Sequence, residues 1–232
     1  MLTRTDMIHF ALTEAEIKQA ILRTLEYLSI SGRDNLRIRH GNIQFDCLLR
    51  GYIGEHAIKK WLMENNIEIK MTNFIEENDQ MDVDFLFRGK NIELKTSLIP
   101  DQDISIDNTL FKRDIKLIKR TEKIEDFKGD VHLQILFAQK RGAKDQWLKA
   151  QRIDIKNEYT DYFYSAFRAD RYCHDTYFAG WIDKPSLINH INSLPYSKRT
   201  WTFGGSSRLF WNYRMRDCKS PAELINYLQA LQ

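Results

Sequence analysis

Two strand-like segments of the sequence carry acidic side chains among apolar ones, at spacings that suit metal-assisted hydrolysis. The first is residues 81–87, which read MDVDFLF, and the second is residues 91–97, which read NIELKTS. Side chains alternate between the two faces of a strand, so Glu93 and Lys95 share one face and Leu94 takes the other. The second segment therefore predicts a carboxylate and an ammonium group side by side.

The first segment supplies a further acid to the same surface. Asp82 and Asp84 share one face of the predicted strand, and Val83, Phe85 and Phe87 take the other. Residues 88–90, which read RGK, can close a hairpin between the two segments, because glycine tolerates a positive φ angle. Pairing of the two strands then predicts that Asp84 lies beside Glu93 and Lys95.

Carboxylates held together in this way favour a particular chemistry. Two carboxylates at one spot repel each other unless protons or a cation neutralise them. Magnesium takes oxygen ligands and keeps several waters, so Asp84, Glu93 and the carbonyl of Leu94 would be sufficient protein ligands. A bound divalent ion activates water and offsets charge on a phosphate, and Lys95 can hold that water. The alternative is a surface hairpin on which the same side chains form salt bridges.

The preceding and following elements must position these strands. Residues 13–16, which read TEAE, form a capping box that opens a predicted helix over residues 13–30. Residues 33–46 are ambiguous between a loop and a short strand. We expect a second helix over residues 49–65 and a strand over residues 67–74.

The remaining elements complete a mixed pattern. The elements that we expect after the acidic strands are a basic amphipathic helix over 110–123, a strong strand over 131–138, a partly helical region around 162–167, a strand over 177–182, a short helix from Pro185, a strand over 208–215 and a last helix from Pro221. Strands and helices mix without strict alternation, which indicates an α/β fold with a central mixed β-sheet flanked by helices. We find no linker, so residues 1–232 are expected to form one domain.

Composition and charge narrow the class of protein. The chain lacks an apolar run of the ~18 residues that a transmembrane helix needs, and lacks a signal-peptide core at its start. Its three cysteines, Cys47, Cys173 and Cys218, are far apart and are expected to be reduced thiols of a cytoplasmic protein. The net charge is +3, but residues 112–149 and 196–219 are strongly basic, whereas acid gathers at residues 76–84. An acidic spot within a basic surface fits an enzyme that acts on a polyanion.

Together, these features resemble the PD-(D/E)xK nuclease superfamily, which has the restriction-endonuclease-like fold. The resemblance covers roughly residues 49–138. It implies that Asp84 is the first metal-binding acid, with Asp82 as the alternative, and that Glu93 and Lys95 are the acid and lysine of the triplet. It further implies that Glu55, on the preceding helix, completes the site. The proline that precedes the first acid in the family pattern is missing here.

The resemblance implies a function as well as a fold. We expect a magnesium-dependent endonuclease that hydrolyses DNA, with manganese as a substitute metal. The Gln-x-x-x-Tyr pattern of exonuclease and helicase-linked branches is absent. The long extension after residue 138 makes the chain more like a type II restriction endonuclease than like a compact resolvase. Nucleases that cut both strands of a palindrome are often two-fold dimers, so a homodimer is a further expectation.

The basic stretches supply candidate contacts to double-stranded DNA. These candidates are Lys112, Arg113, Lys116, Arg199, Arg208 and Arg214. Aromatic residues around 199–208 could instead belong to the core. Three other functions remain open on the sequence alone: a repair or recombination nuclease of the same superfamily, a catalytically silent DNA-binding module, and a metal-dependent hydrolase of nucleotides.

Overall fold

The structure is a computed structural model that describes most of the chain. The described residues are 2–31, 41–72, 83–99, 107, 118, 121–140, 160–169, 176–202 and 209–231. Asp82, the candidate DNA contacts Lys112, Arg113, Lys116 and Arg208, and Cys173 lie outside these ranges.

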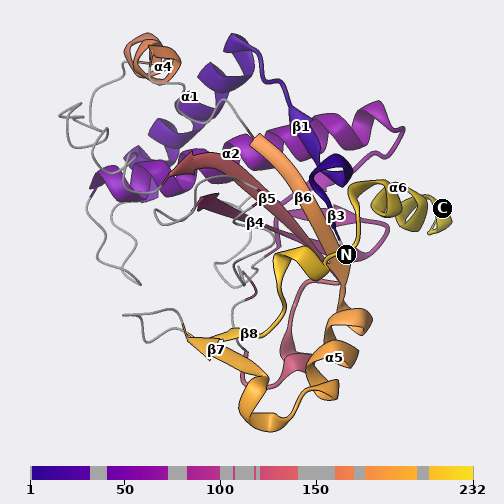
Figure 1. The fold of residues 1–232 in the computed structure, drawn as a ribbon. Helices are drawn as coiled ribbons and strands as arrows, with labels where there is room; N and C mark the ends of the chain where they lie inside the picture. Colours follow the sequence, from indigo (N-terminus) through magenta and orange to yellow (C-terminus); the bar gives the residue numbers. More distant parts are fainter. Residues whose placement is uncertain are drawn as a thin grey trace.

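A six-stranded mixed sheet forms the centre of the fold (Figure 1). The strands are β1 (Ile8–Phe10), β2 (Lys70–Met71), β3 (Phe85–Phe87), β4 (Lys90–Ile99), β5 (Val131–Lys140) and β6 (Thr176–Asp183), with β7 (Thr200–Thr202) and β8 (Leu209–Trp211) forming a separate hairpin. The order in the sheet is β1-β6-β5-β4-β3-β2. Strands β4 and β5 are parallel, and the other neighbours are antiparallel. The predicted α/β class with a mixed sheet is therefore confirmed.

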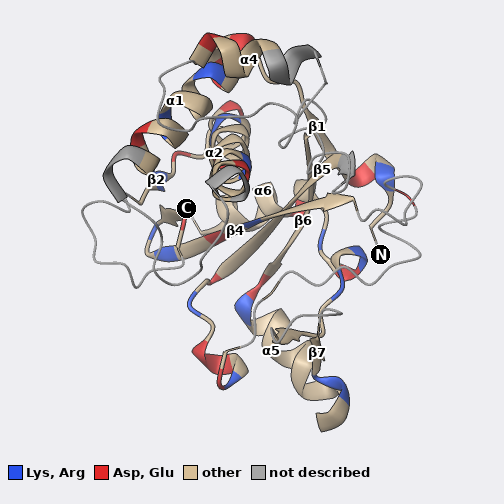
Figure 2. Cartoon of the chain, turned by 90° about the vertical axis from the view of Figure 1, so that its left-hand side faces the viewer, with Lys and Arg blue, Asp and Glu red and all other residues tan. Residues whose placement is uncertain are grey.

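Helices flank this sheet. The described helices of eight or more residues are α1 (Glu14–Ser31), α2 (Gly41–Glu64), α4 (Thr160–Ala169), α5 (Lys184–Ser193) and α6 (Pro221–Ala230). Figure 2 views α2 end-on, above the sheet, with β4 and β6 beneath it and α5 on the far side. Among the described helices, none combines the length and the apolar composition that crossing a membrane requires.

Strand β4 separates two different environments. Its residues Ile92 and Leu94 pack into the main core, together with Leu133 and Ile135 of β5 and side chains of α1 and α2. Helix α2 approaches this face closely, because a Cβ added at Gly54 would lie 3.2 Å from the side chain of Leu94. Alternation along β4 therefore directs Glu93 and Lys95 to the opposite face.

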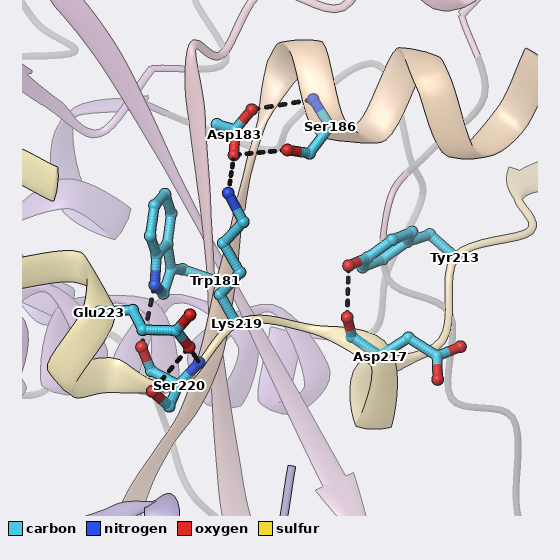
Figure 3. A network of polar contacts seen from close by, with 8 residues as sticks. All are labelled: Trp181, Asp183, Ser186, Tyr213, Asp217, Lys219, Ser220 and Glu223. Carbon is cyan, nitrogen blue, oxygen red and sulfur yellow. Dashed lines mark hydrogen bonds and ion pairs between the residues drawn. The ribbon is translucent and has the colours of Figure 1, made fainter. Parts of the chain in front are cut away.

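The C-terminal segment pairs with the edge of β6. Lys219 and Trp181 exchange two backbone hydrogen bonds, and the indole of Trp181 donates to the carbonyl of Ser220 at 2.9 Å. Asp183 caps α5 through the amide of Ser186 at 2.8 Å and forms an ion pair with Lys219 (Figure 3). These contacts fix the start of α6 against the end of β6.

Several predicted elements are confirmed at the level of local geometry. Arg88 and Gly89 both have positive φ angles, of 45° and 76°, which is the backbone of a two-residue hairpin turn between β3 and β4. The capping boxes at Thr13 and Ser220 form, since each hydroxyl and amide pairs with the glutamate three residues later.

Other predicted boundaries are wrong. Helix α2 begins at Gly41 and not at Leu49, so part of the region assigned to a loop or strand is helical. The strand expected over 208–215 ends at Trp211, and Met215–Asp217 is a 3-10 turn held by its own hydrogen bonds. The predicted helix over 110–123 lies largely outside the described residues, and residues 121–123 are not helical.

The structure describes two of the three cysteines. Cys47 is half-buried and Cys218 is buried, and neither forms a disulfide. Burial raises the pKa of the Cys218 thiol, so this group stays protonated and unreactive.

The close contact at Gly180 of β6 gives a stability prediction. A Cβ there would lie 2.7 Å from the Leu2 side chain and 2.7 Å from the carbonyl oxygen of Lys219. Gly180→Ala should therefore lower the free energy of unfolding by about 1–3 kcal/mol, as measured by urea denaturation. Gly51→Ala in α2 is the control, since a Cβ there meets nothing within 4 Å. It should stabilise the protein by up to about 1 kcal/mol, and equal effects of the two substitutions would contradict the packing argument.

The ion pair at Asp183 gives a pH-dependent prediction. Burial would raise the pKa of Asp183, but the hydrogen bonds from Lys219 and Ser186 outweigh it, and the pKa lies below its ordinary value of 3.8. The stabilisation is thus complete above pH 3.8 and is lost as the pH falls through the lower pKa of the folded state. Asp183→Asn keeps a capping oxygen but loses the charge.

In urea denaturation at pH 7, Asp183→Asn should be less stable than the parent by on the order of 1 kcal/mol. This difference should shrink as the pH is lowered below 3.8. A difference that is independent of pH would show that the charge of Asp183 contributes nothing.

Candidate active site

Glu93 and Lys95 meet on the face of β4 that turns away from α2. The ammonium group of Lys95 lies 2.5 Å from Oε1 of Glu93. Across the parallel ladder, Glu93 faces His132 and Lys95 faces Gln134. The imidazole Nδ1 of His132 lies 3.4 Å from Oε2 of Glu93, and it is the donor because a carboxylate only accepts.

Glu93 is ionised although it is buried. Only 5% of this residue is exposed, and burial by itself would raise the pKa of its carboxyl group. The contacts with His132 and Lys95 outweigh burial, and they lower the pKa of Glu93 to about 2. Glu93 therefore remains an anion at every pH at which the protein would work.

Asp84 departs from simple strand alternation. Its backbone amide donates to the carbonyl of Ile92 at 3.0 Å, although Ile92 already pairs with Phe85. Two residues thus oppose one, as in a β-bulge, a feature that redirects a side chain. The carboxylate oxygen Oδ2 of Asp84 accepts from the amide of Leu94 at 2.5 Å, so it stands between the strands, against the middle of the Glu93–Lys95 triplet.

Glu55 approaches from α2, on the other side of the sheet. It is 7% exposed, and its Oε2 accepts from Nη1 of Arg23 at 2.9 Å. The guanidinium of Arg23 also lies over the ring of Tyr52, 4.1 Å from its centroid. Burial raises the pKa of Glu55 to about 7, with Arg23 lowering it and the negative charge of Asp84 raising it further. Glu55 and Asp84 are therefore close enough to affect each other electrostatically.

The predicted site residues thus form two adjoining groups. One is Glu93 with Lys95, and the other is Asp84 with Glu55. Leu94 connects them, because its amide holds Asp84 and its neighbours in β4 are the acid and the lysine. Within the described residues, no three His, Cys, Asp or Glu side chains lie close enough together to hold a metal ion.

These residues carry oxygen atoms of the type that a hard divalent ion prefers, although they do not form a metal-binding cluster in this structure. Asp84, Glu55 and Glu93 supply carboxylate oxygens, and the carbonyl of Leu94 is the candidate fourth ligand. Burial is the main cause of the raised pKa of Glu55, and the negative charge of Asp84 adds to it. A cation would offset both effects. A metal would compete with Arg23 and Lys95 for the same oxygens.

Two of the arginines predicted to contact DNA, Arg199 and Arg214, interact with other groups of the protein. Arg199 donates from Nε to the carbonyl of Leu194 at 3.1 Å and from Nη2 to that of Asn192 at 3.2 Å, at the end of α5. Nε of Arg214 lies 2.5 Å from the carboxylate of Asp217. Both guanidiniums therefore have a local structural role, and this leaves fewer of their donors for phosphate.

Sequence patterns did not reveal three residues that surround the acids. Arg23 lies in α1, which is distant from the acidic strands in sequence, and only its ion pair identifies it. His132 and Gln134 lie in a strand that was predicted correctly. The sequence did contain a signal for these two residues, because they alternate with Leu133 and Ile135 in an otherwise apolar strand. A strand that is buried on both faces is normally apolar throughout, so polar residues within it indicate a special role.

Comparisons with protein-family models, with curated proteins and with solved structures found no match to this chain. The fold class therefore comes from the sheet and its helices alone.

Glu55 gives a stability prediction that needs no substrate. Its pKa of about 7 in the folded state exceeds the ordinary 4.5, so folding opposes its ionisation. The parent should therefore lose stability as the pH rises from 4.5 to about 7. Glu55→Gln cannot ionise, and it should be more stable than the parent at pH 8 by on the order of 3 kcal/mol, but not at pH 4.

The measurement is urea denaturation of both proteins at the two pH values. Glu64→Gln, at the exposed end of the same helix, is the matched control and should show no such gain. If Glu55→Gln were destabilising by the same amount at both pH values, then the burial of an ionisable carboxyl would not be the dominant effect.

Proposed function

We propose that this protein is a metal-dependent DNA endonuclease of the PD-(D/E)xK type, with Asp84, Glu93, Lys95 and Glu55 as its active site. The observation that carries the proposal is the hydrogen bond from the amide of Leu94 to Asp84. It joins the acid of the first segment to the centre of the Glu93–Lys95 triplet. The electrostatic effect of Asp84 on Glu55 adds the helix acid to the same neighbourhood.

The burial of Glu93 and Glu55 argues against the alternative that these residues only form salt bridges on a surface hairpin. Surface ion pairs form between solvated side chains and contribute little to stability. Glu93 and Glu55 are instead 5% and 7% exposed, and each depends on a basic partner to stay charged. Desolvating a carboxylate costs several kcal/mol even after relaxation. Such an arrangement, unfavourable for stability alone, is what a binding site for a cation would require.

The protein groups divide the chemistry of phosphodiester hydrolysis among them. Asp84, Glu93, Glu55 and the Leu94 carbonyl are the proposed ligands of a divalent ion, and their side chains would have to move together from the two adjoining groups that they form in this structure. Such an ion would activate water and offset charge on the phosphate. Lys95, whose side chain is one-third exposed, can exchange its contact with Glu93 for a water or a phosphate oxygen. Its positive charge would then stabilise the negative charge that develops during attack.

Double-stranded DNA is the proposed substrate because the chain is basic in residues 112–149 and 196–219. Among nucleases of this type, the long C-terminal region favours a site-selective enzyme like a type II restriction endonuclease, acting as a homodimer. The reduced cysteines fit a cytoplasmic setting. A repair or recombination nuclease would use the same residues in the same roles.

Substitution of the lysine tests the assignment directly. Lys95→Ala should lower the rate of plasmid cleavage in Mg²⁺ by on the order of 10² to 10³, because it removes a charge that acts mainly along the reaction path. Lys90→Ala is the matched control, since Lys90 lies in the same strand but its ion pair is with Asp130, at 3.6 Å. It should cleave at the parent rate. Folding of both variants is checked by circular dichroism.

The same assay includes a metal series. The parent should cleave in Mg²⁺ or Mn²⁺ and be inactive with a chelator, and Asp84→Ala and Glu93→Ala should be inactive in all conditions. If the single variants Lys95→Ala and Glu93→Ala both cleaved at the parent rate, then the assignment of the active site would be wrong. Binding to duplex DNA in Ca²⁺ without cleavage in any metal would instead support the silent DNA-binding module.

A further inference from the structure

Strand β5 lies next to the proposed active site and carries two buried polar side chains. Gln134 is completely buried, yet neither Nε2 nor Oε1 of its amide has a hydrogen-bond partner. Nε2 of the neighbouring His132 is also buried without a partner. Among buried side chains, such groups are uncommon, and each requires an explanation such as a bound ligand or a catalytic role.

Both residues occupy the face of the sheet that carries Glu93 and Lys95. In the parallel ladder, His132 is opposite Glu93 and Gln134 is opposite Lys95. Their neighbours in β5, Leu133 and Ile135, belong to the main core on the other face. Adjacent strands lie about 4.8 Å apart, so the amide of Gln134 stands beside the stem of Lys95.

The surroundings of Gln134 leave one direction for a ligand. On its other side it pairs with Gly180 of β6, where Leu2, Cys218 and the carbonyl of Lys219 close over the sheet. Lys95, by contrast, is one-third exposed. The amide of Gln134 is itself fully buried, so a small polar ligand bound at Lys95 would contact it when the Lys95 side chain moves away from Glu93.

We propose that Gln134 is a further residue of the active site and that it accepts a hydrogen bond from the water that Lys95 positions for attack. This inference rests on the proposed function. Lysine can only donate, so its hydrogen bond uses one lone pair of the water. An acceptor such as Oε1 of Gln134 then takes one hydrogen of that water and directs a remaining lone pair towards the phosphorus atom. The attack forms a bond from the water oxygen to phosphorus and breaks the bond from phosphorus to the leaving sugar oxygen. The amide remains neutral, the proton of the attacking water passes to solvent, and solvent protonates the leaving oxygen.

Gln134→Met tests this role, because methionine has a similar length and volume but lacks the polar atoms. Leu136→Met is the matched control, since Leu136 is buried two residues along the same strand. The measurements are the single-turnover rate of duplex cleavage in Mg²⁺, the dissociation constant for DNA in Ca²⁺, and the melting temperature. Gln134→Met should lower the rate about 10²-fold with unchanged DNA affinity.

The melting temperature distinguishes this role from a purely structural one. Removing two unpartnered buried polar atoms should leave the melting temperature of Gln134→Met unchanged or higher. A decrease of more than about 4 °C would overturn the inference, and so would cleavage within two-fold of that of Leu136→Met. If the parent itself does not cleave, then the proposed function fails and the role of Gln134 fails with it. A cleaving parent and an equally active Gln134→Met would reject Gln134 alone.

Discussion

The burial of carboxylates on and beside β4 is the constraint on which the rest of the site depends. A carboxylate that leaves water loses hydration worth several kcal/mol, and it needs charged or hydrogen-bonding partners in return. Glu93 finds them in Lys95 and His132, and Glu55 finds one in Arg23. Three separate elements, α1, β4 and β5, are thus bound to the acids, and their relative positions follow from this requirement.

The two buried acids meet the same constraint with different results. Glu93 has two partners, and its pKa falls to about 2. Glu55 has one partner and a negative neighbour in Asp84, and its pKa rises to about 7. Near neutral pH, Glu93 is therefore a permanent anion, whereas Glu55 changes its charge readily. Different environments that separate the pKa values of two acids in this way allow the acids to have different roles.

Local signals in the sequence predicted the parts of the fold that are local in their physics. The turn between β3 and β4 follows from Gly89, and the starts of α1 and α6 follow from capping boxes. The parallel pairing of β4 with β5 has no such signal, because it depends on a long crossover between them. For this reason, Glu93 and Lys95 could be placed on one face from the sequence, whereas their partners His132 and Gln134 could not.

The alternation rule fails at Asp84 for a physical reason that also explains the arrangement of the site. A bulge opposite Ile92 shifts the aspartate out of register, and its carboxylate takes the place of a backbone acceptor for Leu94. Three constraints then act on Leu94. Its amide donates to Asp84, and its side chain packs against α2 near Gly54. Its neighbours in the strand are the charged residues Glu93 and Lys95. An apolar residue between an acid and a lysine is therefore required at this position. It anchors the strand to the core while its backbone links the acid of β3 to those of β4.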